Sequence, residues 1–432
     1  MLFDIVDTLD LGGEVLNSSK YTVALIGAGH RGKNIYGNFI KKHCSDINIT
    51  AVAEPNLYKR KAFAKEHNIP YERQYKNYEQ LFEQGKIADA LLITTMDHDH
   101  YHPTIKGLEI GYKILLEKPI APNFDEFQKL VDKTRENRDS ILIAHVLRYT
   151  PFYKQLKETL NKSEIGDIKA INHTENVGYY HFVHSYVRGN WRNESVSAPL
   201  ALAKSSHDFD LLTWLLNNKK CKTVFAQGKQ NYFIKDNHPY NAGKHCNRCE
   251  AENNCPYSAK HIYLSKNLPW PKEVVKTMPP LYQRKLGVKF TDLGKCVYLL
   301  DNTMPEVITA NLNYQDNIQV NFTLNGLSKE MTRVTKIYGT KGEIRADFAQ
   351  NKIQLLPFRK KEENIEPPYK QGAHGGGDLG LMEHFESYLK EEYEKDTSTL
   401  EASIESHIVG FAVEQSRRTN KITSVDDFRT NL

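Results

Sequence analysis

Short apolar runs alternate with amphipathic stretches over the first third of the chain. The runs are rich in Val, Ile, Leu and Ala, which is typical of strands buried on both faces. The stretches between them have room for a helix that returns the chain to a parallel neighbour. We predict strands at residues 22–26, 47–54, 88–95, 113–116 and 141–145. This order indicates a doubly wound parallel sheet, in one α/β domain that covers residues 20–150.

Beyond Pro151 the runs instead alternate apolar and polar positions, as strands do when one face packs on a core and the other meets water. We predict strands at 168–177, 222–228, 306–314, 318–324, 333–339 and 342–347, and helices at 207–216, 379–395 and 400–417. Short polar turns between several of these strands favour antiparallel pairing. Residues 151–432 are therefore expected to form an α+β domain with a large, open, mostly antiparallel sheet, an irregular insertion at 229–300 and a helical tail at 377–420.

A glycine-rich loop, Gly27-Ala-Gly29-His30-Arg31-Gly32, follows the first predicted strand and precedes a helical stretch. The first glycine permits a tight turn, the second lets the backbone approach a pyrophosphate, and the third allows the helix to pack closely. The amides and the dipole at the N-terminus of that helix then face the phosphates. The loop, with His30 and Arg31 in it, predicts a Rossmann domain that binds a dinucleotide.

Glu54 ends the second predicted strand, where a carboxylate can accept hydrogen bonds from a ribose 2′-hydroxyl. Its charge would repel a 2′-phosphate, so the sequence favours NAD as the cofactor. Arg31 and Arg60 keep NADP open as an alternative.

Composition narrows the possible partners. Lys and Arg (58) barely exceed Asp and Glu (53) over 432 residues, and the net charge of +5 is spread out, so no nucleic-acid partner is expected. No stretch approaches the ~18 apolar residues that cross a bilayer, and residues 1–20 are acidic, without the basic and apolar regions of a leader. We expect no membrane partner and a cytoplasmic protein.

Two further motifs reveal a family resemblance. Residues 94–100 read Thr-Thr-Met-Asp-His-Asp-His, and Glu117-Lys118-Pro119 begins seventeen residues after His100. In both motifs the chain resembles the Gfo/Idh/MocA family of nucleotide-dependent sugar and cyclitol oxidoreductases. Shorter matches to the same family lie at 145–149, 165–167, 191–192, 207–210 and 339–343. The resemblance implies a Rossmann domain, a C-terminal α/β domain, an active site between them, and copies that pair through the open sheet as a homodimer or homotetramer.

The same resemblance implies roles for individual residues. Thr95, His100 and Glu117 would lie at the cofactor. Lys118, also a cofactor contact, would reach both the nicotinamide and the substrate hydroxyl as a catalytic residue. A lysine at the carboxyl end of a parallel strand lies at the ligand crevice, and desolvation there lowers its pKa toward an acid/base range. The alternative is a solvated lysine at a strand end, and Pro119 is a candidate for a cis peptide.

His207 and Asp210 resemble the family's His-x-x-Asp pair near the substrate. Three apart on a helix, they share one face, and a neutral imidazole can accept a hydroxyl proton while hydride leaves the same carbon. His207 is therefore the second catalytic candidate, although a core or helix-capping histidine would show the same spacing. Many family members carry an aspartate four residues earlier, where this chain has Ala203 beside Lys204. A second cation there would favour an alkoxide or ketone oxygen, so the direction and type of reaction stay open.

Residues 179–192 are dense in groups that bind sugars, because aromatic faces stack on C–H surfaces while Arg and His donate to hydroxyls or a carboxylate. The candidates for substrate contact in and around this segment are Arg148, Tyr149, His181, His184, Arg188, Trp191, Lys204 and Asp210. A polar aromatic loop could equally serve a subunit contact.

Three of the six cysteines are clustered in the insertion, as Cys246-x2-Cys249-x5-Cys255. In a reducing compartment this spacing favours ligation of a metal over disulfides, which makes a structural zinc a candidate. Zinc takes four ligands, and the fourth could be a nearby histidine, Cys221 or Cys296. Unligated thiols are the alternative.

Three functions stay open. The first is an NAD(P)-dependent oxidoreductase that transfers a hydride between nicotinamide and a hydroxyl carbon of a sugar, sugar acid or cyclitol, with Lys118 and His207 managing the proton. The second is an NAD-recycling enzyme with net hydrolysis, elimination or isomerisation of a glycoside, which the missing aspartate keeps open. The third is a non-catalytic nucleotide-sensing regulator, against which Lys118 and His207 both count.

Overall fold

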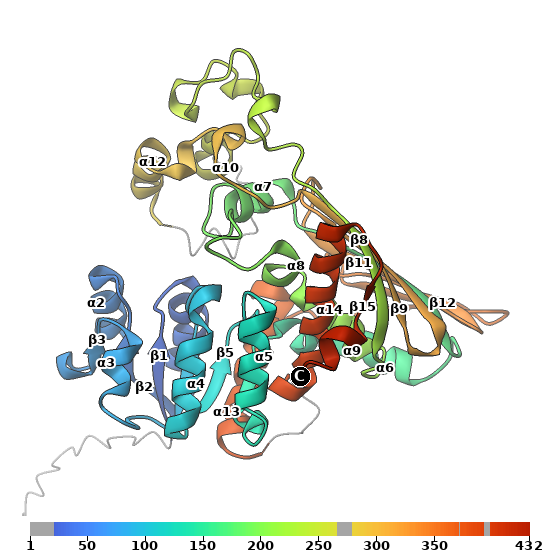
Figure 1. The fold of residues 1–432 in the computed structure, drawn as a ribbon, viewed down its shortest axis with the longest axis horizontal. Coiled ribbons are helices and arrows are strands. Elements are labelled where there is room, and N and C mark those ends of the chain that lie inside the picture. Colours follow the sequence, from blue (N-terminus) through green and yellow to red (C-terminus); the bar gives the residue numbers. More distant parts are fainter. Residues whose placement is uncertain (1–20, 266–278, 371, 393–397) are drawn as a thin grey trace, which may run out of the picture.

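The computed structural model describes residues 21–265, 279–370, 372–392 and 398–432, which form two sheets with their helices and a projecting lobe (Figure 1). Residues 1–20, on which the expectation about a leader depends, lie outside the described residues, as does the end of the helix predicted at 379–395.

The N-terminal sheet is parallel throughout, with the strand order β3-β2-β1-β4-β5-β6. Its strands are β1 Tyr21–Ile26, β2 Ile47–Ala53, β3 Gln74–Tyr75, β4 Ala90–Ile93, β5 Lys113–Leu116 and β6 Ile141–Ile143; its helices are α1 Asn38–His43, α2 Leu57–Glu66, α3 Tyr78–Phe82, α4 Tyr101–Ile110 and α5 Phe124–Lys133. The predicted doubly wound fold is confirmed. β3 is absent from the prediction because two residues carry no periodic signal. The order reverses between β1 and β4, and ligands bind such sheets at the carboxyl ends of the strands beside this reversal.

The C-terminal sheet has the order β14-β13-β12-β11-β7-β10-β9-β8-β15, and β7 and β10 are a parallel pair among antiparallel neighbours. Its strands are β7 Ile168–Asn176, β8 Cys221–Gln227, β9 Val307–Tyr314, β10 Ile318–Asn325, β11 Thr332–Gly339, β12 Gly342–Asp347, β13 Lys352–Pro357, β14 Glu363–Ile365 and β15 Thr423–Ser424. The prediction of a large, mostly antiparallel sheet is confirmed.

Helices cover one face of this sheet. They include α6 Pro151–Asn161, α9 Ser206–Leu215 and α14 Leu400–Thr419 (Figure 1). Alternate positions of β9 and β10 are buried, and the positions between them carry Thr, Asn and Gln at the surface. On that polar face Asn321 Nδ2 donates to Asn172 Oδ1 at 3.0 Å across neighbouring strands. One-sided burial is thus the cause of the alternation in the sequence.

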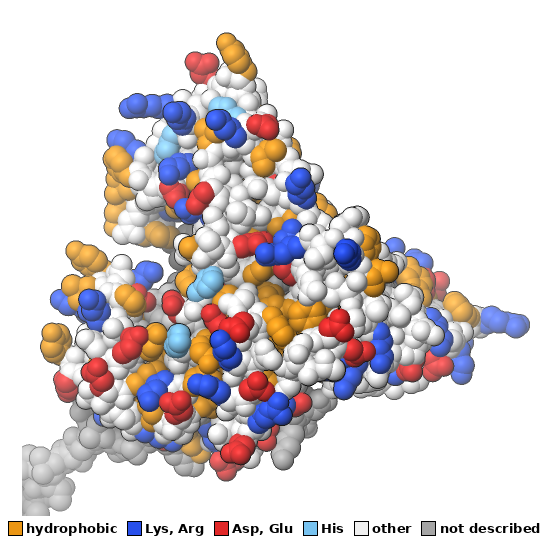
Figure 2. Space-filling model, in the orientation of Figure 1, with side chains coloured by type: hydrophobic (Ala, Val, Ile, Leu, Met, Phe, Trp, Pro, Cys, Tyr) orange, Lys and Arg blue, Asp and Glu red, His pale blue; other side chains and the backbone are white. Residues whose placement is uncertain are grey.

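The remaining helices are α7 Tyr179–Phe182, α8 Leu200–Ala203, α10 Ala259–Leu264, α12 Leu281–Phe290, α13 Gly377–Leu389 and α15 Asp426–Arg429. The projecting lobe is formed by the described residues of the insertion at 229–300 and includes α10 and α12. Figure 2 shows a notch between this lobe and the N-terminal domain. α13 packs against the exit of β6, where Gly377 is so close to Val146 that a Cβ would lie 2.3 Å from Val146 O. The C-terminal helices are therefore part of the body of the protein.

A group of buried charges lies between α9 and the sheet. Arg333 of β11 donates from Nε to Asp208 Oδ1 at 2.7 Å and pairs with Glu175 of β7. His173 Nε2 lies 2.9 Å from Asp208 Oδ1, and Lys204 Nζ lies 3.1 Å from Glu175 Oε1. Arg333 and Lys204 each have a carboxylate partner, which offsets the cost of removing the cations from water, while burial raises the pKa of Glu175 to about 8.

We predict that Arg333→Met lowers the free energy of unfolding by about 3–5 kcal/mol, because it leaves two buried carboxylates without their shared cation. Arg345→Met on β12 is the matched control: Arg345 pairs with Glu343 at the surface, its side chain is 53% exposed, and its loss should cost under about 1 kcal/mol. Urea unfolding followed by circular dichroism measures both. Equal losses would contradict a central role for the buried group.

Candidate active site

The glycine loop connects β1 to a π-helical stretch, His30–Gly37, that leads into α1. Gly27 has a left-handed φ of +94°, and a Cβ there would lie 2.8 Å from Thr94 O. A Cβ on Gly32 would lie 2.3 Å from Gly27 O, whereas a Cβ on Gly29 would meet no atom within 4 Å. The loop therefore needs glycine at 27 and 32 for its own packing, while the space beside Gly29 is open.

Glu54 follows β2 and turns back onto this loop. Its Oε2 accepts a hydrogen bond from Ala28 N at 2.8 Å, and its Oε1 accepts one from Asn56 N at 2.9 Å. Arg60 of α2 donates to the main-chain oxygen of Glu54 at 2.5 Å. Two backbone amides thus fix the carboxylate beside the glycine loop, at the position where the sequence predicts ribose binding.

Arg31 is held in a buried ion cluster. Its Nε donates to Glu117 Oε1 at 2.5 Å and its Nη1 donates to Asp378 Oδ1 at 2.7 Å, while Tyr36 hydrogen-bonds both Arg31 and Glu117. Burial alone would lower the pKa of the guanidinium, but the two carboxylates raise it well above its usual range. Arg31 therefore ties the glycine loop to the end of β5 and to α13.

The two family motifs meet at the turn after β5. His100 is buried with Nδ1 2.7 Å from Pro119 O, and Ile120 N donates to Nε2 of His407 on α14 at 3.0 Å. The Lys118–Pro119 peptide is cis, as predicted. Thr95 Oγ1 donates to Asp99 O at 3.1 Å within its own loop. His100 and His407 thus both hydrogen-bond the backbone of this turn and fix its position.

Lys118 and His207 approach each other from different domains. Lys118 Nζ donates to Ala203 O at 2.6 Å, and Ala203 lies four residues before His207. Burial is the largest effect on both groups: it lowers the pKa of Lys118, and together with the nearby Lys118 it lowers the pKa of His207 well below its usual value. His207 Nδ1 is buried and has no hydrogen-bond partner among the described residues. The imidazole is therefore neutral at physiological pH.

Asp210 makes a different pair from the one that its spacing suggests. Its carboxylate accepts hydrogen bonds from Arg148 Nε at 2.7 Å and from Arg148 Nη2 at 2.6 Å. Tyr149 hydroxyl lies 2.8 Å from Ser398 Oγ. The predicted substrate residues Arg148, Tyr149 and Asp210 are buried in internal contacts that join the exit of β6 to α9 and to the start of α14. Lys204, the fourth of these candidates, is the ion-pair partner of Glu175.

The candidates of residues 179–192 divide between two places. His181 and His184 are at least half buried, and burial, with Arg188 nearby, lowers the pKa of His184 to about 4. Arg188 is directed into the lobe, where it donates to Lys295 O at 3.0 Å and its Nη2 lies 3.7 Å from Cys246 Sγ. Arg188 therefore braces the cysteine-bearing segment.

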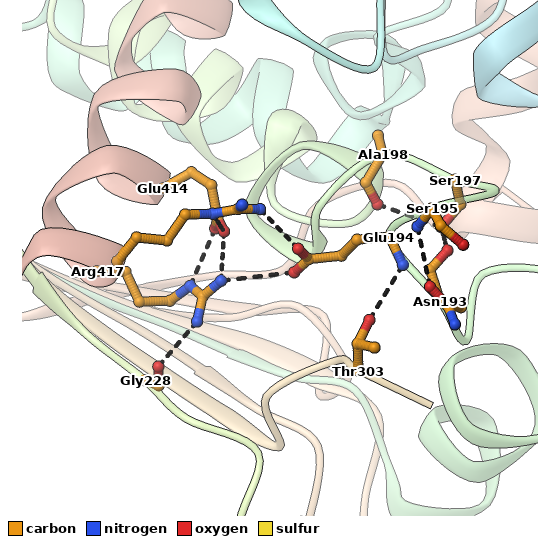
Figure 3. A network of polar contacts seen from close by, with 10 residues as sticks. Asn193, Glu194, Ser195, Ser197, Ala198, Gly228, Thr303, Glu414 and Arg417 are labelled. Carbon is orange, nitrogen blue, oxygen red and sulfur yellow. Dashed lines mark hydrogen bonds and ion pairs between the residues drawn. The ribbon is translucent and has the colours of Figure 1, made fainter. Parts of the chain in front are cut away.

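Trp191 begins a loop whose two ends are both held by Asp97. Asp97 is not among the site residues that the sequence predicts. Asp97 Oδ1 accepts from Trp191 Nε1 at 3.2 Å, and Oδ2 accepts from Ala198 N at 3.1 Å. Between them, Glu194 pairs with Arg417 and Arg418 at the end of α14, at 3.4 Å and 2.6 Å (Figure 3). The loop is thus tied to the Rossmann motif and to α14 together.

His374 and Asp378 are also absent from the sequence-based candidates. His374 Nδ1 lies 2.9 Å from Asp378 Oδ2, and the His374 ring centroid lies 5.9 Å from that of His207. The available signal is the glycine-rich stretch 372–378, Gly-Ala-His-Gly-Gly-Gly-Asp, in which two titratable residues stand one helical turn apart.

Four cysteines line one cavity of about 180 Å³ in the lobe: Cys246, Cys249, Cys255 and Cys296. Cys221 instead lies in β8, where its Sγ is 3.7 Å from the carbonyl oxygens of Thr223 and Asn313. It is therefore separate from these four cysteines. Within the described part of the chain, no group of three or more His, Cys, Asp or Glu side chains is placed to hold a metal ion. Likewise, none of the described helices is long and apolar enough to cross a membrane.

A parallel sheet with a glycine loop and a strand-end carboxylate, faced by a second domain that brings a histidine to the strand-end lysine, defines an NAD(P)-dependent oxidoreductase of two domains. The chain belongs to the Gfo/Idh/MocA family. The family model described as "Oxidoreductase family, NAD-binding Rossmann fold" matches residues 21–145, and that for the "C-terminal alpha/beta domain" matches residues 157–425.

Named relatives include YteT of Bacillus subtilis, named as an oxidoreductase, with 23% identity over 311 residues that cover 68% of this chain and 71% of YteT. Inositol 2-dehydrogenase of Corynebacterium glutamicum is 24% identical over 208 residues, 47% of this chain and 56% of its own length. The structure of scyllo-inositol dehydrogenase from Lactobacillus casei with NAD(H) and scyllo-inositol superposes with a TM-score of 0.64 at 16% identity, over 94% of this chain and 99% of that one. At this identity the structural likeness shows the fold.

We predict that two glycine substitutions in the loop affect different properties, one the stability of the protein and the other its affinity for NADH. Gly32→Ala should lower the free energy of unfolding by about 1–3 kcal/mol, because the new methyl would lie 2.3 Å from Gly27 O. Gly29→Ala meets no atom within 4 Å, so it should leave stability unchanged and weaken NADH binding instead. Thermal unfolding and NADH fluorescence titration separate the two, and unchanged NADH affinity in Gly29→Ala would refute pyrophosphate binding there.

Proposed function

We propose that the protein transfers a hydride between nicotinamide and a hydroxyl carbon of a sugar, sugar acid or cyclitol. The observation that carries the proposal is the hydrogen bond from Lys118 Nζ to Ala203 O at 2.6 Å, which brings the lysine that follows β5 to the end of α8, four residues before His207 of α9. Relatives named as inositol dehydrogenases support a polyol substrate.

Under this proposal Lys118 and His207 hold the reacting oxygen. Their lowered pKa values suit that role, since a desolvated lysine releases a proton more readily and a neutral imidazole can accept one. NAD supplies the redox chemistry by taking or giving the hydride. The protein's contribution is to orient the hydroxyl and to move its proton.

We propose NAD rather than NADP as the cofactor. The Glu54 carboxylate would accept from the ribose hydroxyls and repel a 2′-phosphate. Arg31, the arginine of the glycine loop, forms ion pairs with Glu117 and Asp378 and so is not free to bind a 2′-phosphate. The Arg60 guanidinium donates to the main-chain oxygen of Glu54 and keeps NADP as the alternative cofactor.

A second candidate is an enzyme that recycles bound NAD, oxidising a carbon transiently so that a neighbouring bond can be eliminated. Ala203 in place of the family's aspartate favours it, because the carboxylate–histidine arrangement at His207 is missing. Net formation of NADH in the presence of substrate distinguishes the two reactions, since the recycling reaction forms none.

The proposal extends to assembly. The open face of the C-terminal sheet carries polar side chains such as Asn172 and Asn321 on adjacent strands, and we propose that a second copy of this chain covers it. We also propose the cytoplasm as the location, on the reducing environment that six free cysteines suit.

We further propose a structural zinc in the lobe, with Cys296 as the fourth ligand to Cys246, Cys249 and Cys255. All four line the same cavity. Backbone pairing supports the assignment, because Cys296 N donates to Lys244 O at 3.0 Å and so brings Cys296 beside Cys246. Amides donate to two of the sulfurs, to Cys246 Sγ at 3.4 Å and to Cys249 Sγ at 3.3 Å, as they do around metal-bound thiolates. Binding requires the four thiols to turn toward a common centre.

We predict that Lys118→Met and His207→Gln each lower kcat by about 10²–10⁴-fold in a screen of polyols and sugar acids that follows NAD reduction at 340 nm, because each removes a group that handles the hydroxyl proton. Lys113→Met is the matched control, as Lys113 begins the same strand, β5, and pairs with Glu391 at the surface. Full activity in both site variants would refute the assignment. NADH binding without turnover on any substrate would favour a nucleotide-sensing regulator.

We predict about one zinc per chain when the protein is purified without chelator and measured by inductively coupled plasma mass spectrometry. Cys296→Ser should remove the metal and lower the melting temperature, because three thiolates hold zinc less tightly than four. Cys221→Ser is the control and should keep it, since Cys221 lies in β8. Wild-type protein with less than about a tenth of an equivalent of zinc would refute the site.

A further inference from the structure

His374 lies where three elements of the site meet. It belongs to the glycine-rich stretch before α13, its ring centroid is 5.9 Å from that of His207, and its charge affects the pKa of His30 in the glycine loop. The side chain of His374 is 36% exposed to solvent, whereas residue His207 is 5% exposed. No role described so far uses this imidazole.

Asp378 holds the ring of His374 in place. Oδ2 lies 2.9 Å from His374 Nδ1, and Oδ1 accepts from Arg31 at 2.7 Å. Burial alone would raise the pKa of Asp378, but Arg31 and His374 outweigh it and lower that pKa well below its usual value. An ionised carboxylate at Nδ1 keeps the ring proton there and leaves the lone pair on Nε2.

His207 has no comparable partner. The residue four positions before it is Ala203, Asp210 is engaged by Arg148, and His207 Nδ1 is unpartnered among the described residues. A proton that reaches His207 would create a buried imidazolium beside Lys118. The proton must therefore pass from His207 to a group that is both close and in contact with water. His374 meets both conditions.

The backbone also distinguishes position 374. His374 has φ of +51°, between Gly372 at +136° and Gly375 at +60°. This left-handed region favours glycine, and three glycines, residues 375–377, follow His374 directly. In this turn the imidazole of His374 is held by the carboxylate of Asp378.

We propose that His374, held by Asp378, is the acid/base group that exchanges the substrate's proton with solvent. The inference rests on the proposed function. On oxidation, the O–H bond of the substrate breaks and its proton ends on Nε2 of His374, directly or through His207. The electron pair of that bond becomes the second bond of the carbonyl, and the hydrogen on carbon leaves with its own pair as hydride to the oxidised nicotinamide. The carboxylate–histidine pair missing at Ala203 is thus supplied from the start of α13.

His374→Gly tests the proposal without straining the turn, because glycine adopts its φ freely. With NAD and myo-inositol, D-glucose or D-glucuronate, we expect kcat to fall by about 10²-fold and added imidazole to restore about a tenth or more of it. NADH affinity and melting temperature should stay unchanged. His374→Asn, which can still donate to Asp378 but cannot take the proton, should be equally slow; wild-type kcat in it overturns the inference.

Two further readouts separate failures. A loss in His374→Gly that imidazole does not rescue, together with weaker NADH binding, assigns His374 to the cofactor loop and overturns the proton role. Nitrogen-15 histidine NMR at pH 8 needs no substrate and compares wild type with His374→Asn: protonation at Nδ1 is expected, and an Nε2-protonated ring overturns the inference. Wild-type protein that does not bind NADH overturns the proposed function and this inference with it.

Discussion

The Arg31 guanidinium joins the three segments that build the site. It stands in the glycine loop and pairs at once with Glu117 at the end of β5 and with Asp378 at the start of α13. Burying these charges is costly, and the cost is offset only while all three are ionised and in contact. Because Glu117 precedes Lys118, the same cluster couples the position of the glycine loop to that of the strand-end lysine.

His207 is buried and Lys118 is half-buried, and the interior around them is rich in paired charge. Behind the site, Arg333 and Lys204 are matched by Asp208 and Glu175. His145, His207 and His407 are neutral by contrast, because burial lowers their pKa values, that of His407 to about 3. Neutral rings act here as hydrogen-bond partners: His407 accepts from the backbone after Pro119, and so α14 helps to hold a turn of the other domain.

Much of the fold follows from the sequence. Runs such as 23–26 are apolar throughout and lie in a sheet buried on both faces, while β9 and β10 alternate and lie in a sheet with one wet face. The glycine loop and Glu54 are likewise local, since strand, turn, helix and acid follow in order along the chain. The two-residue β3 and the π-helical start of the first helix lack such a signal, because each is imposed by neighbours.

The sequence by itself therefore determined the two sheets, the place of the dinucleotide loop, and Lys118 and His207 as residues to test. Only the tertiary structure decided which charges pair. Arg148 and Asp210 are 62 residues apart, and Arg31 and Asp378 are 347 apart, so spacing could not connect them. The same holds for His374 beside His207 and for Cys296 beside Cys246. Helical periodicity reports which face a residue occupies, whereas the partner on that face depends on how distant elements pack.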